Sequence, residues 1–150
     1  MDRSADNLGQ IINDIQRDLE ELKTTQLRNA EEQWGKYEVV GSGNNYAWKF
    51  DDGRLICFQR IAYSDVAVTS SWGGMYYGVL PSPTDYAVAF LQPPTVSAVI
   101  EANGYNAWIA TRDDPGSETT PPTYQLIRPT SATCAGYLDI VAYGVWSSGE

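Results

Sequence analysis

The sequence contains no histidine among its 150 residues. Histidine is the commonest general base, triad partner and transition-metal ligand, so its absence removes most routes to hydrolytic or metal-dependent chemistry. Basic residues are also scarce, since 10 Lys and Arg stand against 19 Asp and Glu, for a formal net charge of −9. A phosphate backbone needs a basic surface to neutralise it, so this balance argues against nucleic acid as a partner.

Long apolar runs are missing as well. No apolar stretch approaches the ~20 residues needed to cross a bilayer, and residues 1–10 lack the apolar segment of a secretory signal peptide. We therefore expect a soluble chain without membrane insertion. Only two cysteines are present, and Cys57 and Cys134 show neither metal-ligand nor redox spacing. Both lie in strand-like runs and are expected to be buried, reduced thiols.

Apolar residues recur in residues 1–34 with the alternating spacing of four and three that is typical of a coiled coil. The alternative is an amphipathic helix that packs on its own domain. We predict a stalk at 1–34 through which copies of the chain associate, although the heptads do not by themselves separate a dimer from a trimer. The predicted association residues are Leu8, Ile12, Ile15, Leu19 and Leu22.

From residue 35 to residue 150 the hydrophobic period changes to two, which predicts a β domain of antiparallel sandwich or barrel type. Strands do not alternate with helices, so a parallel α/β fold is not expected. Asp52-Gly53 and Asn103-Gly104 each predict a two-residue hairpin turn, between 46–51 and 54–61 and between 95–102 and 105–111. Further strands are predicted at 86–91, 123–128 and 137–146, with weaker signals at 62–69 and 75–80.

Motifs of catalysis or phosphate binding are not found. The glycines of "GSGNN" at 41–45 precede no helix and no Gly-Lys-Ser/Thr, which indicates a flexible joint. Asp51 and Asp52 flank a turn, where aspartate is favoured for geometry alone. Asp113-Asp114-Pro115-Gly116 could offer oxygen ligands to calcium, but without EF-hand spacing a solvated loop is the preferred interpretation. We predict that the chain is not an enzyme and uses no cofactor or metal.

The sequence is rich in tryptophan and tyrosine, with 5 Trp and 10 Tyr against 3 Phe. These side chains combine an apolar face with a hydrogen-bonding tip, which suits contact surfaces and stacking on sugar rings. Trp48, Trp108 and Trp146 lie within strand patterns and are assigned to the core or to a subunit interface. The glycines of "SSWGGMYYG" instead indicate a loop or strand edge, where a ligand site and a subunit interface are equally good interpretations. The candidate ligand-binding residues are Trp72, Tyr76, Tyr77, Arg112, Asp113 and Asp114.

Three segments together resemble a known protein family. "YAWKFDDGRLICFQRI" is similar to the opening of the C-terminal head domains of bacteriophage and prophage tail-fibre or receptor-binding proteins. "YAVAFLQPPTVSAVI" resembles their strand followed by a proline and a Pro-x-Val strand, and "YQLIRPTSATCAGYLDIVAYGVW" resembles their closing strand. The resemblance covers about residues 44–146. Phe58-Gln59-Arg60 and the loop at 112–122 depart from the pattern, which leaves the ligand open.

The resemblance implies a homotrimer of antiparallel, jelly-roll-like β-sandwich heads on a coiled-coil stalk. It implies display on a virion assembled in the host bacterial cytoplasm, attachment to other virion proteins through the N-terminus, and binding of a host surface saccharide by the head. Two alternatives remain: a purely structural capsid-decorating or baseplate fibre, and a glycan-cleaving depolymerase. The depolymerase would need two carboxylates ~5–10 Å apart across a groove.

Overall fold

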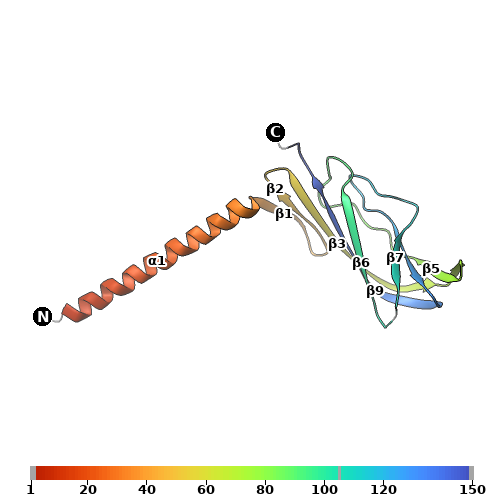
Figure 1. The fold of residues 1–150 in the computed structure, drawn as a ribbon, viewed down its shortest axis with the longest axis horizontal. Helices are drawn as coiled ribbons and strands as arrows, with labels where there is room; N and C mark the ends of the chain where they lie inside the picture. Colours follow the sequence, from red (N-terminus) through yellow and green to blue (C-terminus); the bar gives the residue numbers. More distant parts are fainter. Residues whose placement is uncertain (1–2, 105, 149–150) are drawn as a thin grey trace. The chain divides into compact units, whose positions relative to one another are not determined.

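The computed structural model describes residues 3–104 and 106–148 (Figure 1). The chain divides into two compact units, a helical unit that ends at Lys36 and a β unit that begins at Tyr37. The predicted boundary lay two residues earlier, between 34 and 35. Gly35 and Lys36 are the only residues between the helix and the first strand.

The helical unit is a single helix, α1 (Arg3–Trp34). Its five predicted association residues lie on one stripe, and they are 47% to 59% exposed in the single chain. Its ion pairs, such as Lys23–Glu20 at 3.2 Å, join residues on the solvated surface. The predicted helix is confirmed, whereas its assembly into a coiled coil remains a prediction. In the part of the chain that is described, no helix has the length and apolar content needed to span a membrane.

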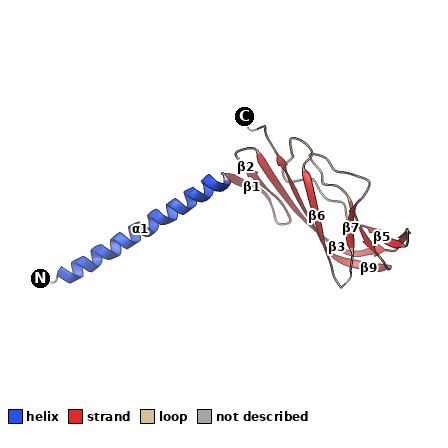
Figure 2. Ribbon diagram, viewed as in Figure 1, coloured by secondary structure: helices blue, strands red, loops and turns tan. Residues whose placement is uncertain are grey.

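The β unit contains two antiparallel sheets, as predicted (Figure 2). One has five strands in the order β1 (Tyr37–Ser42), β2 (Asn45–Phe50), β3 (Arg54–Val68), β9 (Ala132–Val145) and β6 (Thr95–Ala102). The other has four, in the order β4 (Ser70–Trp72), β5 (Met75–Val79), β8 (Tyr124–Arg128) and β7 (Trp108–Thr111). Every strand pair is antiparallel.

The two sheets share a core. Alternate residues of β3 and β9 meet alternate residues of β8, because successive side chains of a strand point to opposite faces. Leu126, Leu138 and Ile140 are at most 1% exposed. The buried cluster comprises Tyr63, Val66, Val68, Leu80, Tyr124, Leu126, Cys134, Leu138 and Ile140.

Cys57 and Cys134 are free, buried thiols, as predicted. Burial raises the pKa of the Cys57 thiol from its ordinary 9.0 to about 11. The unfolded thiol therefore ionises at a lower pH than the folded one, so stability is full below pH ~9 and falls as the pH rises toward 11. We expect a loss of about 1–2 kcal/mol from this group over that window.

The measurement is the urea midpoint at pH 8, 9, 10 and 11 for the wild type and Cys57→Ala. Burial also raises the pKa of Tyr63, Tyr86 and Tyr124, so the variant should keep part of the alkaline decline and lose the rest. Identical pH slopes for the two proteins would contradict the assignment.

The β2–β3 hairpin forms where Asp-Gly predicted it, but its loop contains three residues, 51–53. Gly53 has a φ of 97°, and its N–H donates to the Phe50 carbonyl at 3.1 Å. The Asp52 carboxylate accepts the backbone N–H of Arg54 at 3.1 Å, which lowers the pKa of Asp52. The turn thus explains Asp52 without a catalytic role.

The prediction of a flexible joint at 41–45 is wrong, because these residues close a second tight hairpin between β1 and β2. Ser42 pairs with Asn45, so Gly43 and Asn44 form a two-residue turn. Gly43 has a φ of 63°, the left-handed conformation that the first position of a type II′ turn requires.

The predicted hairpin between 95–102 and 105–111 is also wrong. β6 pairs with β9 in the five-stranded sheet, whereas β7 pairs with β8 in the four-stranded sheet. Gly104 has a φ of 74°, and the Asn103 N–H donates to the Ala135 carbonyl at 2.9 Å. The Asn-Gly turn is therefore real, but it carries the chain from one sheet to the other.

The predicted strand at 86–91 is wrong, because its hydrogen bonds go to loop residues 118 and 119 and to Val145 and form no ladder. Tyr86 and Phe90 donate from their backbone N–H groups to Thr119 and Glu118, at 2.9 and 2.8 Å. Their rings meet edge to face with centroids 5.0 Å apart and pack on Ala47, Leu55, Cys57 and Ala142. The segment is an irregular cover over part of the five-stranded sheet.

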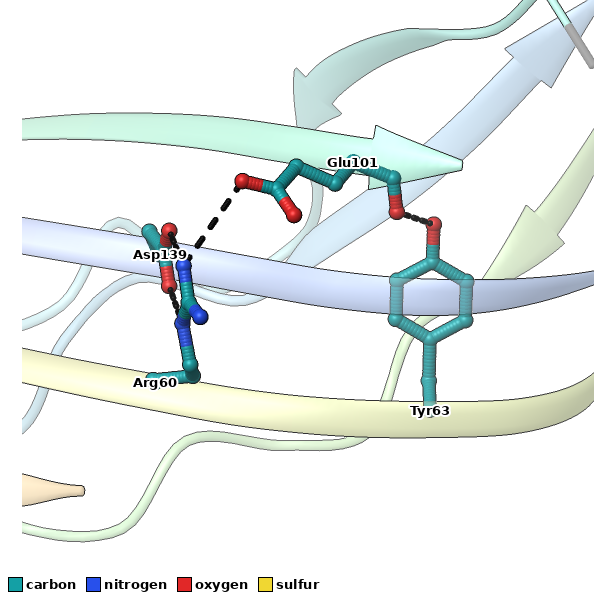
Figure 3. Close-up of polar contacts among 4 residues, drawn as sticks. All are labelled: Arg60, Tyr63, Glu101 and Asp139. Atoms are coloured by element: carbon teal, nitrogen blue, oxygen red, sulfur yellow. Dashed lines mark hydrogen bonds and ion pairs between the residues drawn. The ribbon is translucent and has the colours of Figure 1, made fainter. Parts of the chain in front are cut away.

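A close approach of three strands occurs at Gly136 of β9, which pairs with Tyr63 of β3. Figure 3 shows the Tyr63 ring crossing β9 so that its hydroxyl donates to the Glu101 carbonyl of β6 at 2.9 Å. A Cβ built on Gly136 would overlap that same carbonyl. Only a residue without a side chain fits at this position.

Candidate functional site

A hollow of about 350 Å³ lies on the four-stranded sheet. Its lining comes from all four strands and from the two residues after β7, and consists of Trp72, Tyr77, Thr111, Arg112, Asp113 and Gln125. Trp72 belongs to one edge strand, β4, and Arg112 follows the other, β7. The hollow therefore has an aromatic side and a charged side.

The aromatic side is positioned by the hairpin of β4 and β5. Trp72 pairs with Met75, so Gly73 and Gly74 alone form the turn. Their φ angles are 54° and 84°, both in the left-handed region that a type I′ turn requires. Trp72 ends β4 beside this turn and is 62% exposed. The two glycines thus present a tryptophan to solvent on a short, well-defined strand.

The charged side is held by backbone hydrogen bonds to the segment before β8. The Arg112 N–H donates to the Thr123 carbonyl at 2.8 Å, and the Thr123 N–H donates to the Asp114 carbonyl at 3.1 Å. The Asp114 carboxylate accepts the Gly116 N–H at 2.8 Å, which closes the loop behind Asp113. The side chains of Arg112 and Asp113 are exposed, and Arg112 Nη2 lies 3.6 Å from Asp113 Oδ2. Asp113 retains acceptor capacity toward a ligand, since its side chain is 86% exposed.

This donor and acceptor set suits a ligand rich in hydroxyl groups. Arg112 offers a planar array of donors, Asp113 accepts, and the Gln125 amide does both. The rings of Trp72 and Tyr77 offer apolar faces on which the C–H side of a sugar ring can stack. Among the residues described, no three His, Cys, Asp or Glu side chains gather as metal ligands would.

The hollow brings together four of the six candidate ligand residues and leaves out two. Tyr76 packs against the core, because adjacent residues of β5 face opposite sides of the sheet. Asp114 uses its carboxylate to close its own loop. Trp108, assigned to the core or an interface, is 55% exposed on the edge strand β7.

Thr111 and Gln125 line the hollow but were not among the candidates. Gln125 lies between the buried Tyr124 and Leu126, so alternation alone places its side chain on the outer face. Its proximity to Tyr77 depends on the pairing of β5 with β8, for which the sequence contains no signal.

Comparisons with known proteins return two fibre structures. The chain is similar to an N-truncated R1-type pyocin tail fibre, with 17% identity and a TM-score of 0.45 over 78% of this chain and 94% of that one. It is also similar to a Pseudomonas aeruginosa R1 pyocin fibre comprising C-terminal residues, with 15% identity and a TM-score of 0.45 over 77% of this chain and 30% of that one.

No protein-family model matches the chain, and no curated protein matches it.

Proposed function

We propose that the chain is a phage virion fibre protein of the tail-fibre or receptor-binding type, a homotrimer whose β head binds a host cell-surface glycan. The observation that carries the proposal is the hollow in which Trp72 and Tyr77 face Arg112, Asp113 and Gln125. The head is a jelly-roll-like β-sandwich, and other virion proteins are bound through the N-terminus. The motif resemblance to fibre heads supports this assignment.

The apolar stripe of α1 supports association of the chain, and the resemblance to fibre heads supports three copies. Ile12 and Leu19 occupy a positions, whereas Leu8, Ile15 and Leu22 occupy d positions, and all five are half exposed in the single chain. Full burial of one such side chain contributes roughly 1.5–3 kcal/mol of favourable free energy, which provides the driving force for association. Isoleucine at both a and d is compatible with more than two strands.

Three heads on one stalk would present three copies of the hollow. A single open hollow of this size holds a sugar weakly, because little of the ligand is removed from water. Linking three such sites raises avidity by orders of magnitude when the sites engage one surface together. Three weak sites on one trimer would thus be sufficient to attach it to a cell surface.

The test is binding of the full chain to an array of bacterial surface oligosaccharides. We expect Trp72→Ala to weaken binding at least about tenfold, the equivalent of roughly 1.4 kcal/mol, because the stacking platform is lost. Trp108→Ala is the matched control, since Trp108 is 55% exposed on the same sheet against 62% for Trp72. The control should bind like the wild type.

Equal losses in both tryptophan variants would place the glycan elsewhere on the head. Absence of binding to every oligosaccharide by a stable trimer would favour the alternative function, a purely structural capsid-decorating or baseplate fibre without a ligand site.

A further inference from the structure

The outer face of the five-stranded sheet is apolar, although it points away from the core. An antiparallel sheet that covers a core on one side usually presents polar residues on the other. Here Ile56 and Phe58 of β3 point away from the buried Leu55 and Cys57 of the same strand. We call this surface the aromatic face, and its central residues are Val39, Tyr46, Trp48, Ile56, Phe58, Val141 and Tyr143.

The strand register aligns these side chains into two rows across the sheet. Val39 pairs with Trp48, Trp48 with Ile56, and Ile56 with Tyr143. In the adjacent row Tyr46 pairs with Phe58, and Phe58 with Val141.

The rings are fixed by contact with one another. The Tyr46 centroid lies 5.3 Å from that of Trp48 and 5.1 Å from that of Phe58. Aromatic pairs at such distances hold defined orientations. The face is therefore an ordered surface, ready for packing without a large entropic cost.

The exposed area of this face is large for a single chain. At the centre of the aromatic face, Val39 is 57% exposed and Tyr143 is 48% exposed. The exposed side chains at the margins of the face are Tyr37 (56%), Tyr137 (42%), Val99 (62%) and Val145 (39%). With up to ~200 Å² for a tyrosine, these six side chains alone leave on the order of 500 Å² of exposed surface. The whole face thus approaches the ~800 Å² that each partner contributes to a standard stable interface.

Charged groups on this face are paired and lie toward its two ends. At one end Arg54 pairs with Asp52 of the adjoining turn, and at the other Arg60 lies between Asp139 and Glu101. The Arg60 guanidinium donates to both carboxylate oxygens of Asp139 at 2.7 Å (Figure 3). It lies 3.6 Å from the Glu101 carboxylate and 4.8 Å from the centre of the Tyr137 ring. An approaching partner would therefore meet paired charges at the margin and apolar side chains at the centre, the usual anatomy of a subunit interface.

We propose that the aromatic face packs against other copies of this chain, as the head-to-head interface of the fibre. The inference rests on the proposed homotrimer. Only Gly35 and Lys36 separate α1 from β1, and Tyr37 and Val39 of β1 lie on the aromatic face. Association through α1 would hold the heads at a millimolar effective concentration, at which a face of moderate affinity is occupied. The hollow lies on the other sheet and stays open.

Four valines provide a matched test by cysteine labelling in the full chain. Three of the cysteines are introduced on the aromatic face or at its margin, by Val39→Cys, Val99→Cys and Val145→Cys. The fourth, Val79→Cys, is introduced on the four-stranded sheet. In the single chain these valines are 57%, 62%, 39% and 46% exposed, respectively. The native thiols are at most 2% exposed, so the wild type reports the background. The measurements are the rate of maleimide labelling and the mass by light scattering.

We expect the cysteines at 39, 99 and 145 to react at least about tenfold more slowly than the one at 79, although two of the three valines are more exposed than Val79 in the single chain. A trimer in which all four react at similar rates would overturn the head-to-head interface and leave the proposed trimer standing. A monomeric mass would overturn the trimer and with it this interface.

Discussion

Gly136→Ala is expected to destabilise the β unit by about 3–5 kcal/mol, in the range reached by few single substitutions. The added methyl would occupy the position of the Glu101 carbonyl oxygen. Relief requires that β6 move away from β9, which would also break the Tyr63 hydrogen bond to that carbonyl. The measurement is urea unfolding followed by tryptophan fluorescence, supported by far-ultraviolet circular dichroism.

Two further glycine substitutions separate this overlap from other effects of alanine. Gly104 has a φ of 74° but open space around its Cβ position, so Gly104→Ala should cost only the ~1–2 kcal/mol of left-handed strain. Gly9 lies in α1, again with open space, so Gly9→Ala should favour the helix by about 0.5–1 kcal/mol. A Gly136→Ala chain no less stable than Gly104→Ala would refute the steric argument.

Ile15→Asp is expected to reduce the solution mass from about three times 16.6 kDa to the mass of a single chain. At a d position, the substitution would bring three carboxylates together in the apolar seam of the stalk. Burying an unpaired charge costs several kcal/mol for each chain, more than one heptad layer contributes. Light scattering at several concentrations measures the effect.

The control is Asn13→Asp, which introduces the same residue at an outward b position. It should remain a trimer. A wild-type mass of 16.6 kDa would refute the coiled coil itself, and the apolar stripe of α1 would then need another partner. If both aspartate variants dissociate equally, the heptad register would be wrong while the trimer stands.

Local sequence signals predicted the secondary structure well where hydrogen bonds are local. The heptad spacing located α1, and Asp52-Gly53 located the β2–β3 hairpin, because helices and tight turns are specified by residues within a few positions of each other. The same reasoning failed for 86–91. The alternation of Tyr86, Val88 and Phe90 resembles a strand, yet the backbone of this segment bonds to loop residues 118 and 119.

In the candidate site, too, local signals identified some residues and contacts between distant strands decided the others. Trp72 and Tyr77 stood out because glycines surround them, and Arg112 and Asp113 because they follow a strand. Tyr76 was misplaced, since only the pairing of β5 with β8 decides which of two adjacent tyrosines faces the core. Gln125 carries no local signal. It joins the hollow only because its strand, β8, pairs with β5, which lies about 50 residues earlier in the chain.

The sequence by itself determined that one helix precedes an antiparallel β unit, that the two thiols are buried and free, and that residues suited to catalysis are few. These follow from composition and from the periods of 3.6 and 2, which depend on neighbouring residues alone. Only the tertiary structure decided that the chain changes sheets at Asn103-Gly104, that Gly136 must lack a side chain, and that four strands of one sheet align their aromatic side chains outward. Each depends on register between distant strands, where a shift of one residue would reverse every face.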